Sequence, residues 1–383
     1  MKLRTLSSKT DLRGKRVLLR VDWNVPLGGK LAADDVVKIQ RSLPTIRDLS
    51  RRGAMVMVLT HLGRPKGADP KFSTKQLLPL LKKKFGLSVQ FHADLSPLKI
   101  IKPGLIVLFE NVRFQPGEEE GDKALAKRYA AFGDLFINDA FASSHRAHVS
   151  VAGLAKVLPA YAGPQLMAEV NALERLLCQP KRPFVAVISG LKVSSKLSVL
   201  KSLLRVCDKL LVGGAMANTF FEAKGLGMGK SFVETESISD AKKLLKNKKI
   251  VLPSDLVVTR DTERGSGQEA VPQKVDDQDI VVDAGPLTLL QWQKILAKAK
   301  TILWNGPLGM VEKPAFTKST LDLVQVIAHT RAFSVIGGGD TIPLVYRAKL
   351  ADQISHVSMG GGALLEFIAL RGRLPGLLPL IVK

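Results

Sequence analysis

The sequence is poor in cysteine and has no long apolar run, and each shortage excludes a class of protein. Two cysteines in 383 residues, Cys178 and Cys207, are too few for a disulfide framework and lack the spacing of metal ligands. No stretch approaches the ~18 consecutive apolar residues of a transmembrane helix, and residues 1–10 lack the apolar core of a signal peptide. We therefore expect a cytoplasmic protein without membrane association, in which the cysteines are small structural residues.

Aromatic and acidic residues are also scarce. Aromatic side chains make up 5% of the chain and are not interleaved with the basic runs, so specific nucleic-acid binding is not expected. Only 34 Asp and Glu face 57 Lys and Arg, which leaves a net charge of +23. The surplus is denser in residues 1–165, where 28 basic residues face 14 acidic ones. Such a surplus predicts an anionic partner: a phosphorylated metabolite, a nucleic acid or an acidic surface.

Apolar, β-branched runs alternate with helix-length segments along the whole chain, which predicts parallel α/β architecture. With 46% hydrophobic residues the chain can build sizeable cores, and its length suggests two domains. The strands expected first are residues 16–21, 54–60, 105–109 and 135–137. A second series is expected at residues 184–188, 209–212, 249–252, 280–282, 301–304 and 332–336. We therefore predict two doubly wound, Rossmann-like parallel sheets.

One helix is predicted between the two series of strands. Residues 163–177 have the apolar spacing of a helix, and two prolines in residues 179–183 end it. We place an N-terminal domain at residues 1–165, a linker helix at 166–182, a C-terminal domain at 183–365 and a tail at 366–383. The apolar residues 374–383 are expected to pack back against one lobe, because a long exposed apolar tail would be a liability.

The first series of strands leads into charged side chains. In open parallel sheets, ligands bind outside the carboxyl ends of the strands. Three arginines and three histidines follow the ends of these strands: Arg64, Arg113, Arg146, His61, His145 and His148. We expect them to converge, and the planar guanidinium fork matches phosphate and carboxylate oxygens. The sequence therefore predicts a site for a small polyanion in the N-terminal lobe.

The second series leads instead into glycine-rich loops that contain Gly213, Gly214, Gly337, Gly338 and Gly339. Glycine lets the backbone approach a phosphate, whose oxygens then accept hydrogen bonds from free N–H groups. These loops predict a nucleotide site, where Asp340 is the best candidate ligand for Mg²⁺. Residues 225–231 (GLGMGKS) are not a P-loop, because the first glycine of that motif is replaced by Lys224 and no strand precedes it.

A lobe for a small polyanion and a lobe for a nucleotide, joined by a helical hinge, form the layout of a domain-closing kinase. The segments RVDWNVP, HLGRP, ENVRF, NDAF…HRAH, WNGPLG, GGGDT and GGGALLE occur in that order along the chain. Together they resemble the phosphoglycerate kinase family, from about Arg13 to Gly376. The resemblance implies reversible phosphoryl transfer between 1,3-bisphosphoglycerate and ADP, giving 3-phosphoglycerate and MgATP, in glycolysis and by a monomer.

The resemblance also implies roles for individual residues. It assigns the phosphoglycerate to six side chains, namely Asp22, Asn24, His61, Arg64, Arg113 and Arg146. Lys192 and Lys196 match the lysines of the family's Gly-Gly-Ala-Lys-x-x-x-Lys segment, which contact nucleotide phosphates and the transferring group. Asn305 and Glu312 would face the nucleotide, with Glu312 on the ribose. Asp340 would bind Mg²⁺ and Thr341 would help to hold the phosphates.

Some positions depart from the family's pattern. Lys38 stands where the family has the arginine that stabilises the transferring phosphoryl group, so it keeps the charge and loses the fork. Together with Lys192 and Arg146 we count Lys38 among the catalytic residues, and we expect a slowed enzyme. Arg41 lies one helical turn further and is a candidate substitute. Ser189, Ser195 and Met359 also depart, on the nucleotide side.

Two other functions remain open at this point. A family member that has lost most of its catalysis could act as a binding or regulatory protein, which the lysine at position 38 favours. The retained arginines and lysines oppose that interpretation. The third function, a basic nucleic-acid-binding protein, rests on the charge alone.

Overall fold

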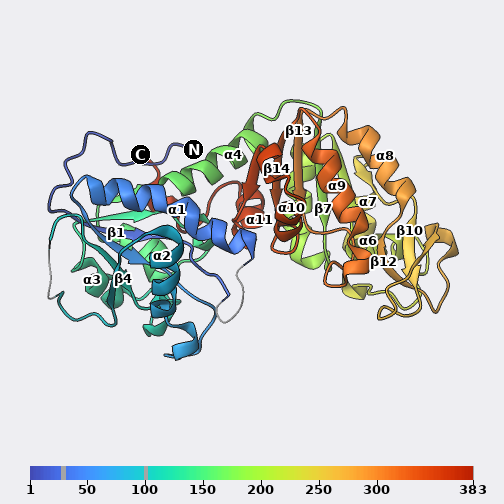
Figure 1. Cartoon of the computed structure of the whole chain (residues 1–383). Coiled ribbons are helices and arrows are strands. Elements are labelled where there is room, and N and C mark those ends of the chain that lie inside the picture. The colour runs from blue at the N-terminus through green and yellow to red at the C-terminus, as the bar shows by residue number, and fades with distance from the viewer. Residues whose placement is uncertain (27–31, 99–101, 383) are drawn as a thin grey trace. The chain divides into compact units, whose positions relative to one another are not determined.

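The computed structural model describes residues 1–26, 32–98 and 102–382, and the chain divides into two compact units. Unit 1 comprises Met1–Asn171 and Gly372–Lys383, and unit 2 comprises Ala172–Arg371 (Figure 1). Helix α4 (Pro164–Cys178) matches the single helix predicted over residues 163–177. Its first half belongs to unit 1 and its second half to unit 2.

Unit 1 contains a six-stranded parallel sheet in the order β3-β4-β2-β1-β5-β6. The strands are β1 (Arg16–Arg20), β2 (Met55–Leu59), β3 (Gln90–His92), β4 (Ile106–Phe109), β5 (Leu135–Asn138) and β6 (Ala160–Ala162). The four predicted strands are present, with ends that differ by at most one residue. The edge strands β3 and β6 were not predicted, since three residues carry too little periodicity to be recognised.

The helices of unit 1 are α1 (Ala33–Arg51), α2 (Leu78–Phe85) and α3 (Lys123–Ala130). Apolar residues of α1, Ile39, Leu43 and Ile46, enter one core with the buried side chains of the sheet. The chain end returns to this unit: Leu3 and Ile381 form an antiparallel bridge, and the Gly376 N–H donates to the Ser144 carbonyl at 2.8 Å. The predicted packing of the tail on a lobe is therefore present.

Unit 2 contains a second six-stranded parallel sheet in the order β15-β14-β13-β7-β8-β9. Its strands are β7 (Phe184–Ser189), β8 (Lys209–Gly213), β9 (Ile250–Val251), β13 (Thr301–Asn305), β14 (Phe333–Gly337) and β15 (His356–Ser358). The helices of this unit are α5 (Leu197–Val206), α6 (Met216–Glu222), α7 (Ile238–Leu245), α8 (Pro286–Leu296), α9 (Lys318–Ala328), α10 (Ile342–Arg347) and α11 (Gly362–Ala369). Two doubly wound parallel sheets confirm the predicted fold class.

A small antiparallel sheet in unit 2 corrects one expectation. Strands β10 (Leu256–Thr259), β11 (Gln268–Ala270) and β12 (Ile280–Ala284) pair in the order β11-β10-β12. The prediction that residues 280–282 join the parallel sheet is wrong. A short apolar run predicts a strand but does not predict which strand it pairs with. Here residues 280–284 pair with β10 and not with the parallel sheet. Its own cluster of apolar side chains, including Phe221 and Met228, supports this sheet.

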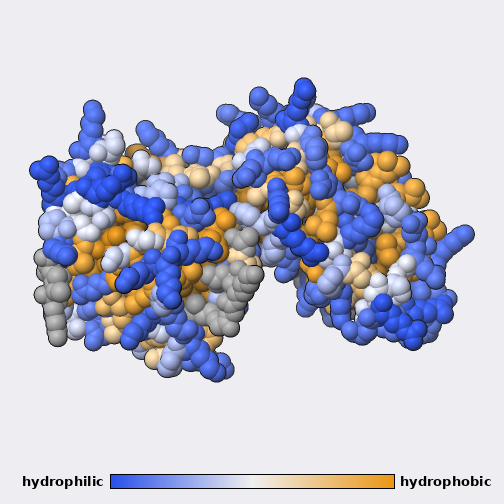
Figure 2. All heavy atoms as spheres, viewed as in Figure 1, coloured by the Kyte–Doolittle hydropathy of each residue, from blue (hydrophilic) through white to orange (hydrophobic). Residues whose placement is uncertain are grey.

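The surface of each unit is mixed in polarity. Figure 2 shows hydrophilic side chains over much of the visible face of both units, with apolar atoms between them. This is ordinary for a folded protein, because there is not enough polar surface to cover a core completely. The large surplus of positive charge therefore has to be located residue by residue.

Candidate active site

The predicted arginines and histidines gather at the carboxyl ends of the strands of unit 1. His61 follows β2, Arg113 lies in the turn after β4, and Arg146 and His148 follow β5. The positive charges of Arg113 and Arg146 lower the pKa values of both His61 and His148. The charge of Arg64 likewise lowers the pKa of Arg113. His145 lies half-buried beside Arg146 in the same loop. The structure therefore brings this set into one cationic cluster.

His61 is held by Arg20, a residue that the sequence analysis missed. Arg20 is the last residue of β1 and is 1% exposed, and its Nη2 lies 3.0 Å from His61 Nδ1. A guanidinium can only donate, so Nδ1 accepts and the proton of the neutral ring sits on Nε2. Burial lowers the pKa of His61 well below its usual 6.5, and Arg20 and Arg113 lower it further. His61 is thus an uncharged hydrogen-bond donor at neutral pH.

His148 is neutral for the same reasons. Its side chain is buried, and burial together with Arg113 and Arg146 lowers its pKa to about 4. The permanent positive charge of the cluster at pH 7 therefore belongs to the arginines. An anion bound there would gain charge-assisted hydrogen bonds from guanidinium groups and neutral ones from the imidazoles.

A buried network lies behind Arg20. Ser150 connects two charged residues, because its hydroxyl accepts from Arg20 Nε at 3.0 Å and donates to the Glu118 carboxylate. Glu118 is 1% exposed and also accepts the Ser150 backbone N–H at 3.1 Å. Burial raises the pKa of Glu118 to about 7, although Ser150 and Arg20 oppose the rise. This network fixes the guanidinium that in turn orients His61.

Glu118→Gln should change how stability depends on pH. In the folded protein Glu118 keeps its proton up to about pH 7, whereas the unfolded chain loses it near 4.5. Raising the pH through this window therefore lowers the free energy of unfolding of wild type by on the order of 3 kcal/mol. The glutamine variant, which does not titrate, keeps that stability. Urea unfolding of both proteins at pH 5 and pH 8 measures the difference. An equal gap between the two proteins at both pH values would contradict the assignment.

Asp22, Asn24 and Lys38 lie at the end of β1 and on the facing side of α1. The Asn24 side-chain oxygen accepts the Gly63 N–H at 2.8 Å, which ties the β1 loop to the β2 loop. Lys38 Nζ lies 3.2 Å from the Asp35 carboxylate and 3.5 Å from the Asn24 carbonyl. Burial raises the pKa of Asp22, and the charges of Arg20 and Lys38 oppose the rise. Lys38 is therefore beside the cluster but already ion-paired.

At two glycines in the loops of unit 2, the neighbouring backbone leaves no room for a side chain. Gly214 follows β8 with φ +66°, and a Cβ there would lie 2.7 Å from the Gly190 nitrogen. Gly306 follows β13 with φ +96°, and its Cβ would lie 2.0 Å from the Ser189 carbonyl. The strand ends of β7, β8 and β13 thus approach one another through bare backbone. The hydroxyl of Ser189, which departs from the family's glycine, is accommodated by donating to the Pro307 carbonyl.

Lys196 is the cation at the centre of these loops. Its Nζ donates to Asn305 Oδ1 at 3.0 Å and to the Ser189 carbonyl. Burial lowers the pKa of Lys196 to about 8, and the Asp340 carboxylate opposes this. Lys192, by contrast, is exposed, and its carbonyl accepts the Ser195 hydroxyl at 2.9 Å. The two predicted lysines therefore differ, one fixed inside the loops and one extending into solvent.

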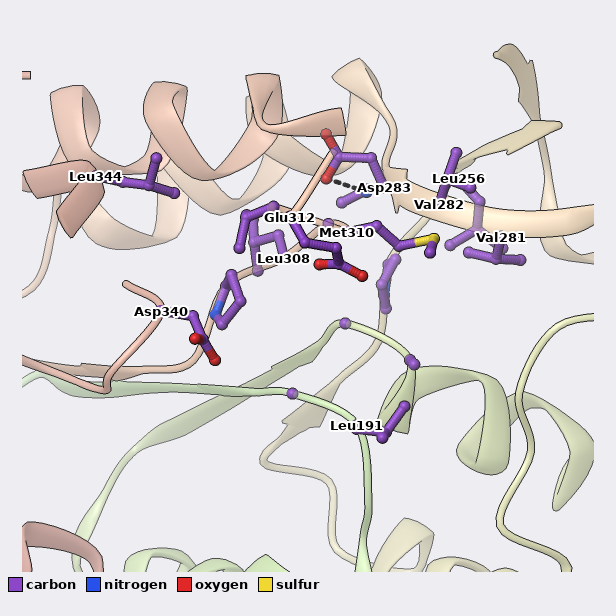
Figure 3. A pocket seen from close by; sticks show the side chains of 18 of the residues that line it. Leu191, Leu256, Val281, Val282, Asp283, Leu308, Met310, Glu312, Asp340 and Leu344 are labelled. Carbon is purple, nitrogen blue, oxygen red and sulfur yellow. Dashed lines mark hydrogen bonds between the residues drawn. The ribbon is translucent and has the colours of Figure 1, made fainter. Parts of the chain in front are cut away.

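A cavity of about 530 Å³ opens beside the loops of unit 2. Four of the predicted nucleotide residues line it, namely Gly214, Glu312, Gly339 and Asp340. Figure 3 shows the Glu312 and Asp340 side chains around the same space, with apolar side chains beside them. Most of the wall is apolar, formed by residues that the sequence analysis did not single out: Leu191, Pro253, Leu256, Val281, Leu308, Met310 and Leu344. These residues are scattered along the sequence, and Pro253 and Leu256 in particular lie far from the predicted glycine loops.

The remaining predicted residues lie next to this cavity rather than in its wall. Gly213 ends β8, and Gly337 ends β14 and leads into Gly338, where an added Cβ would lie 3.3 Å from Asn305 Nδ2. Thr341 is fully buried, and its hydroxyl has no hydrogen-bond partner among residues 1–26, 32–98 and 102–382. An oxygen-rich ligand at this loop would supply one.

No group of three or more His, Cys, Asp or Glu residues capable of holding a metal ion occurs in the described part of the chain. None of the helices within those same residues combines the length and apolar character needed to cross a lipid bilayer. Cys207 is buried as expected, whereas Cys178 is exposed and is not a packing residue.

Two Rossmann-like units, one with an arginine cluster and one with glycine loops around a lysine, define the class of two-domain phosphotransferases. The family model of phosphoglycerate kinase matches residues 7–371, and the chain belongs to that family.

Two phosphoglycerate kinases of similar sequence and two solved structures agree with this assignment. The phosphoglycerate kinase of Thermus thermophilus is 44% identical over 389 residues, which cover 96% of this chain and 97% of that protein. The one from Rubrobacter xylanophilus is 43% identical over 376 residues, with 96% and 95% covered. The solved structure from Coxiella burnetii has a TM-score of 0.88 at 41% identity and covers 99% of both chains. The one from Pyrococcus horikoshii has a TM-score of 0.86 at 32% identity, with 98% of both covered.

Proposed function

We propose that the protein transfers a phosphoryl group reversibly between 1,3-bisphosphoglycerate and ADP, giving 3-phosphoglycerate and ATP. The observation that carries the proposal is the neutral, oriented His61 inside an arginine cluster, in a chain of this family. A cluster of fixed guanidinium groups with uncharged donors suits a small ligand that carries both phosphate and carboxylate oxygens. The enzyme would act as a cytoplasmic, glycolytic monomer.

The phosphoglycerate would lie against the strand ends of unit 1. Arg64, Arg113 and Arg146 would bind its phosphate and carboxylate oxygens. His61 would donate through Nε2, because Arg20 occupies its Nδ1. Asp22 and Asn24 would accept from the substrate hydroxyl, and Asn24 is already fixed by the Gly63 N–H.

The nucleotide would occupy unit 2. Its base would enter the apolar part of the 530 Å³ cavity, while the Glu312 carboxylate would accept from the ribose hydroxyls. Its phosphates would lie along the bare backbone of the loops that contain Gly213, Gly214, Gly337, Gly338 and Gly339. There the buried Thr341 hydroxyl would gain the partner that it lacks within the described residues.

Mg²⁺ would be held by Asp340 together with phosphate oxygens and water. A single carboxylate at the rim of the phosphate loops fits this ion, which keeps several waters and binds through one or two carboxylates plus substrate phosphates. The ion, when bound, neutralises charge on the phosphates. No further ligand from the described residues is needed.

The chain's own contribution to the reaction is positioning and positive charge. An anionic oxygen of ADP attacks the acyl phosphate, the phosphorus–oxygen bond to the carboxyl group breaks, and 3-phosphoglycerate leaves as a carboxylate, so no proton has to move. Lys196, Lys192 and Lys38 would stabilise the transferring group. Because the two substrates must meet in line and without water, we propose that the units close on each other about helix α4.

A coupled assay with 3-phosphoglycerate and MgATP tests the proposal. We expect saturable turnover at a rate below the 1–100 s⁻¹ typical of kinases, because Lys38 lacks the guanidinium fork. If no turnover is detected at any substrate concentration, the proposal is overturned and the alternative of a binding or regulatory family member is favoured. In that case calorimetry would still detect binding of ADP or 3-phosphoglycerate to the protein.

A further inference from the structure

Basic stretches precede four neighbouring strands of unit 1. Residues 7–16 lead into β1, 47–53 into β2, 82–86 towards β3, and 102–104 into β4, and these strands are adjacent in the order β3-β4-β2-β1. Because the strands are parallel, all four stretches lie at the amino-terminal edge of the sheet. The cluster of arginines and histidines lies at the opposite, carboxyl ends of the strands of this sheet. We call these four stretches the basic edge.

The four stretches form one surface. Residues 47–53 are hydrogen-bonded to each of the other three stretches. The Gly14 N–H donates to the Gly53 carbonyl at 3.1 Å, Arg47 Nη2 to the Phe85 carbonyl at 2.6 Å, and Ser50 Oγ to the Gly104 carbonyl at 2.7 Å. Helix α1 ends at Arg51, within the stretch 47–53 that contacts the other three. Positive charges from segments far apart in the sequence are therefore collected in one place.

The basic edge carries a large share of the surplus charge. It holds eleven Lys and Arg against two Asp, a net +9 out of +23 for the chain. Nine of the cations are exposed, namely Lys9, Arg13, Lys15, Arg47, Arg51, Lys82, Lys83, Lys84 and Lys102. The ion pairs found here among the described residues are Arg16–Asp134 and Arg52–Asp48. Most of this charge therefore has no acidic counterpart within the part of the chain that the structure describes.

Helix dipoles explain only part of this arrangement. Cations at the ends of α1 and α2 are favourable because a helix C-terminus carries a partial negative charge. Residues 7–16, however, precede the first helix and still supply Lys9, Arg13, Lys15 and Arg16. Packing nine exposed like charges together costs electrostatic free energy unless a polyanion neutralises them.

We propose that the basic edge binds the phosphate backbone of duplex nucleic acid without reading its sequence. The edge offers nothing for bases to stack on, because its single aromatic residue, Phe85, packs against the core. It also lacks an apolar anchor, since none of the exposed large apolar side chains of the described residues belongs to it. Stable binding to a membrane takes such an anchor in addition to a basic patch. A duplex, with one negative charge per ~1.7 Å, needs only the charges.

Fluorescence anisotropy with a labelled, random-sequence DNA duplex tests the proposal on the full-length protein. We expect a dissociation constant between about 1 and 100 µM at physiological salt, and a steep loss of affinity between about 50 and 200 mM salt. Lys82→Glu/Lys83→Glu/Lys84→Glu should reduce the slope of log K against log salt by about three. Its kinase turnover should equal that of wild type, since none of the three lysines belongs to the active site.

A matched variant separates this surface from net charge. Lys242→Glu/Lys246→Glu/Lys248→Glu changes the same charge on exposed lysines of unit 2 and should leave duplex affinity within about twofold. Saturating 3-phosphoglycerate should not displace the duplex, because the site proposed for 3-phosphoglycerate lies at the opposite, carboxyl ends of the strands. Equal weakening by both variants, displacement by substrate, or tighter binding to equimolar phosphatidylserine–phosphatidylcholine vesicles would each overturn the proposal.

Discussion

Lys196→Met should lower kcat by about 10²–10³-fold, the loss expected when one preorganised donor to a developing charge is removed. The ammonium is held by Asn305 and the Ser189 carbonyl, so it cannot be replaced by a mobile side chain. Lys196→Met removes both of these hydrogen bonds, but it also removes a charge that burial disfavours, so the two effects on the free energy of unfolding oppose each other. The midpoint of thermal unfolding should therefore shift by no more than about 4 °C.

The pH profile of wild type checks the same assignment. Because the pKa of Lys196 is lowered to about 8, the ammonium is charged below that pH and neutral above it. If the charge stabilises the transferring phosphoryl group, kcat/KM is flat below pH 8 and falls above it, and Lys196→Met abolishes that fall. Lys201→Met, an exposed lysine on α5, is the matched control and should change turnover by less than about twofold. A Lys196→Met variant with more than a tenth of wild-type kcat would contradict the role.

The strand ends could be predicted from the sequence because each combines an apolar run with polar residues next to it. His61, Arg113 and Arg146 lie in the segments that follow buried strands, so the rule for parallel sheets was enough to bring them together. The glycines at 213, 214 and 337 were found in the same way. Local order along the chain carried all of this information.

Arg20 and the small sheet of unit 2 could not be predicted in that way. Arg20 is the last residue of an otherwise largely apolar strand, and its partners His61, Ser150 and Glu118 come from three other segments. Nothing in the spacing of these residues indicates contact. Likewise, residues 280–282 read as a strand, but their pairing with β10 depends on tertiary packing. The apolar wall of the nucleotide cavity was missed because its residues are separated in the sequence.

Lys38→Arg should raise kcat by about tenfold and Lys38→Met should lower it by about 10²-fold, within the 10³–10⁵ that a full arginine finger contributes. Lys38 Nζ lies 3.2 Å from the Asp35 carboxylate, so in the proposed reaction a compact ammonium would have to serve both this partner and the phosphoryl group. A guanidinium has five N–H donors and could satisfy both at once. Steady-state turnover of the three proteins under identical conditions measures the effect.

Arg41 is the other residue that could supply the positive charge assigned to Lys38. It lies three residues from Lys38 on α1, one helical turn away, and is half-buried. If Lys38 carries the charge to the phosphoryl group, Arg41→Met changes kcat by less than about twofold, and the gain in Lys38→Arg appears in kcat rather than in KM. A large loss in Arg41→Met together with no effect of Lys38→Arg would transfer the role to Arg41. Arg41 would then be a catalytic residue at a position where the family's sequence pattern does not place one.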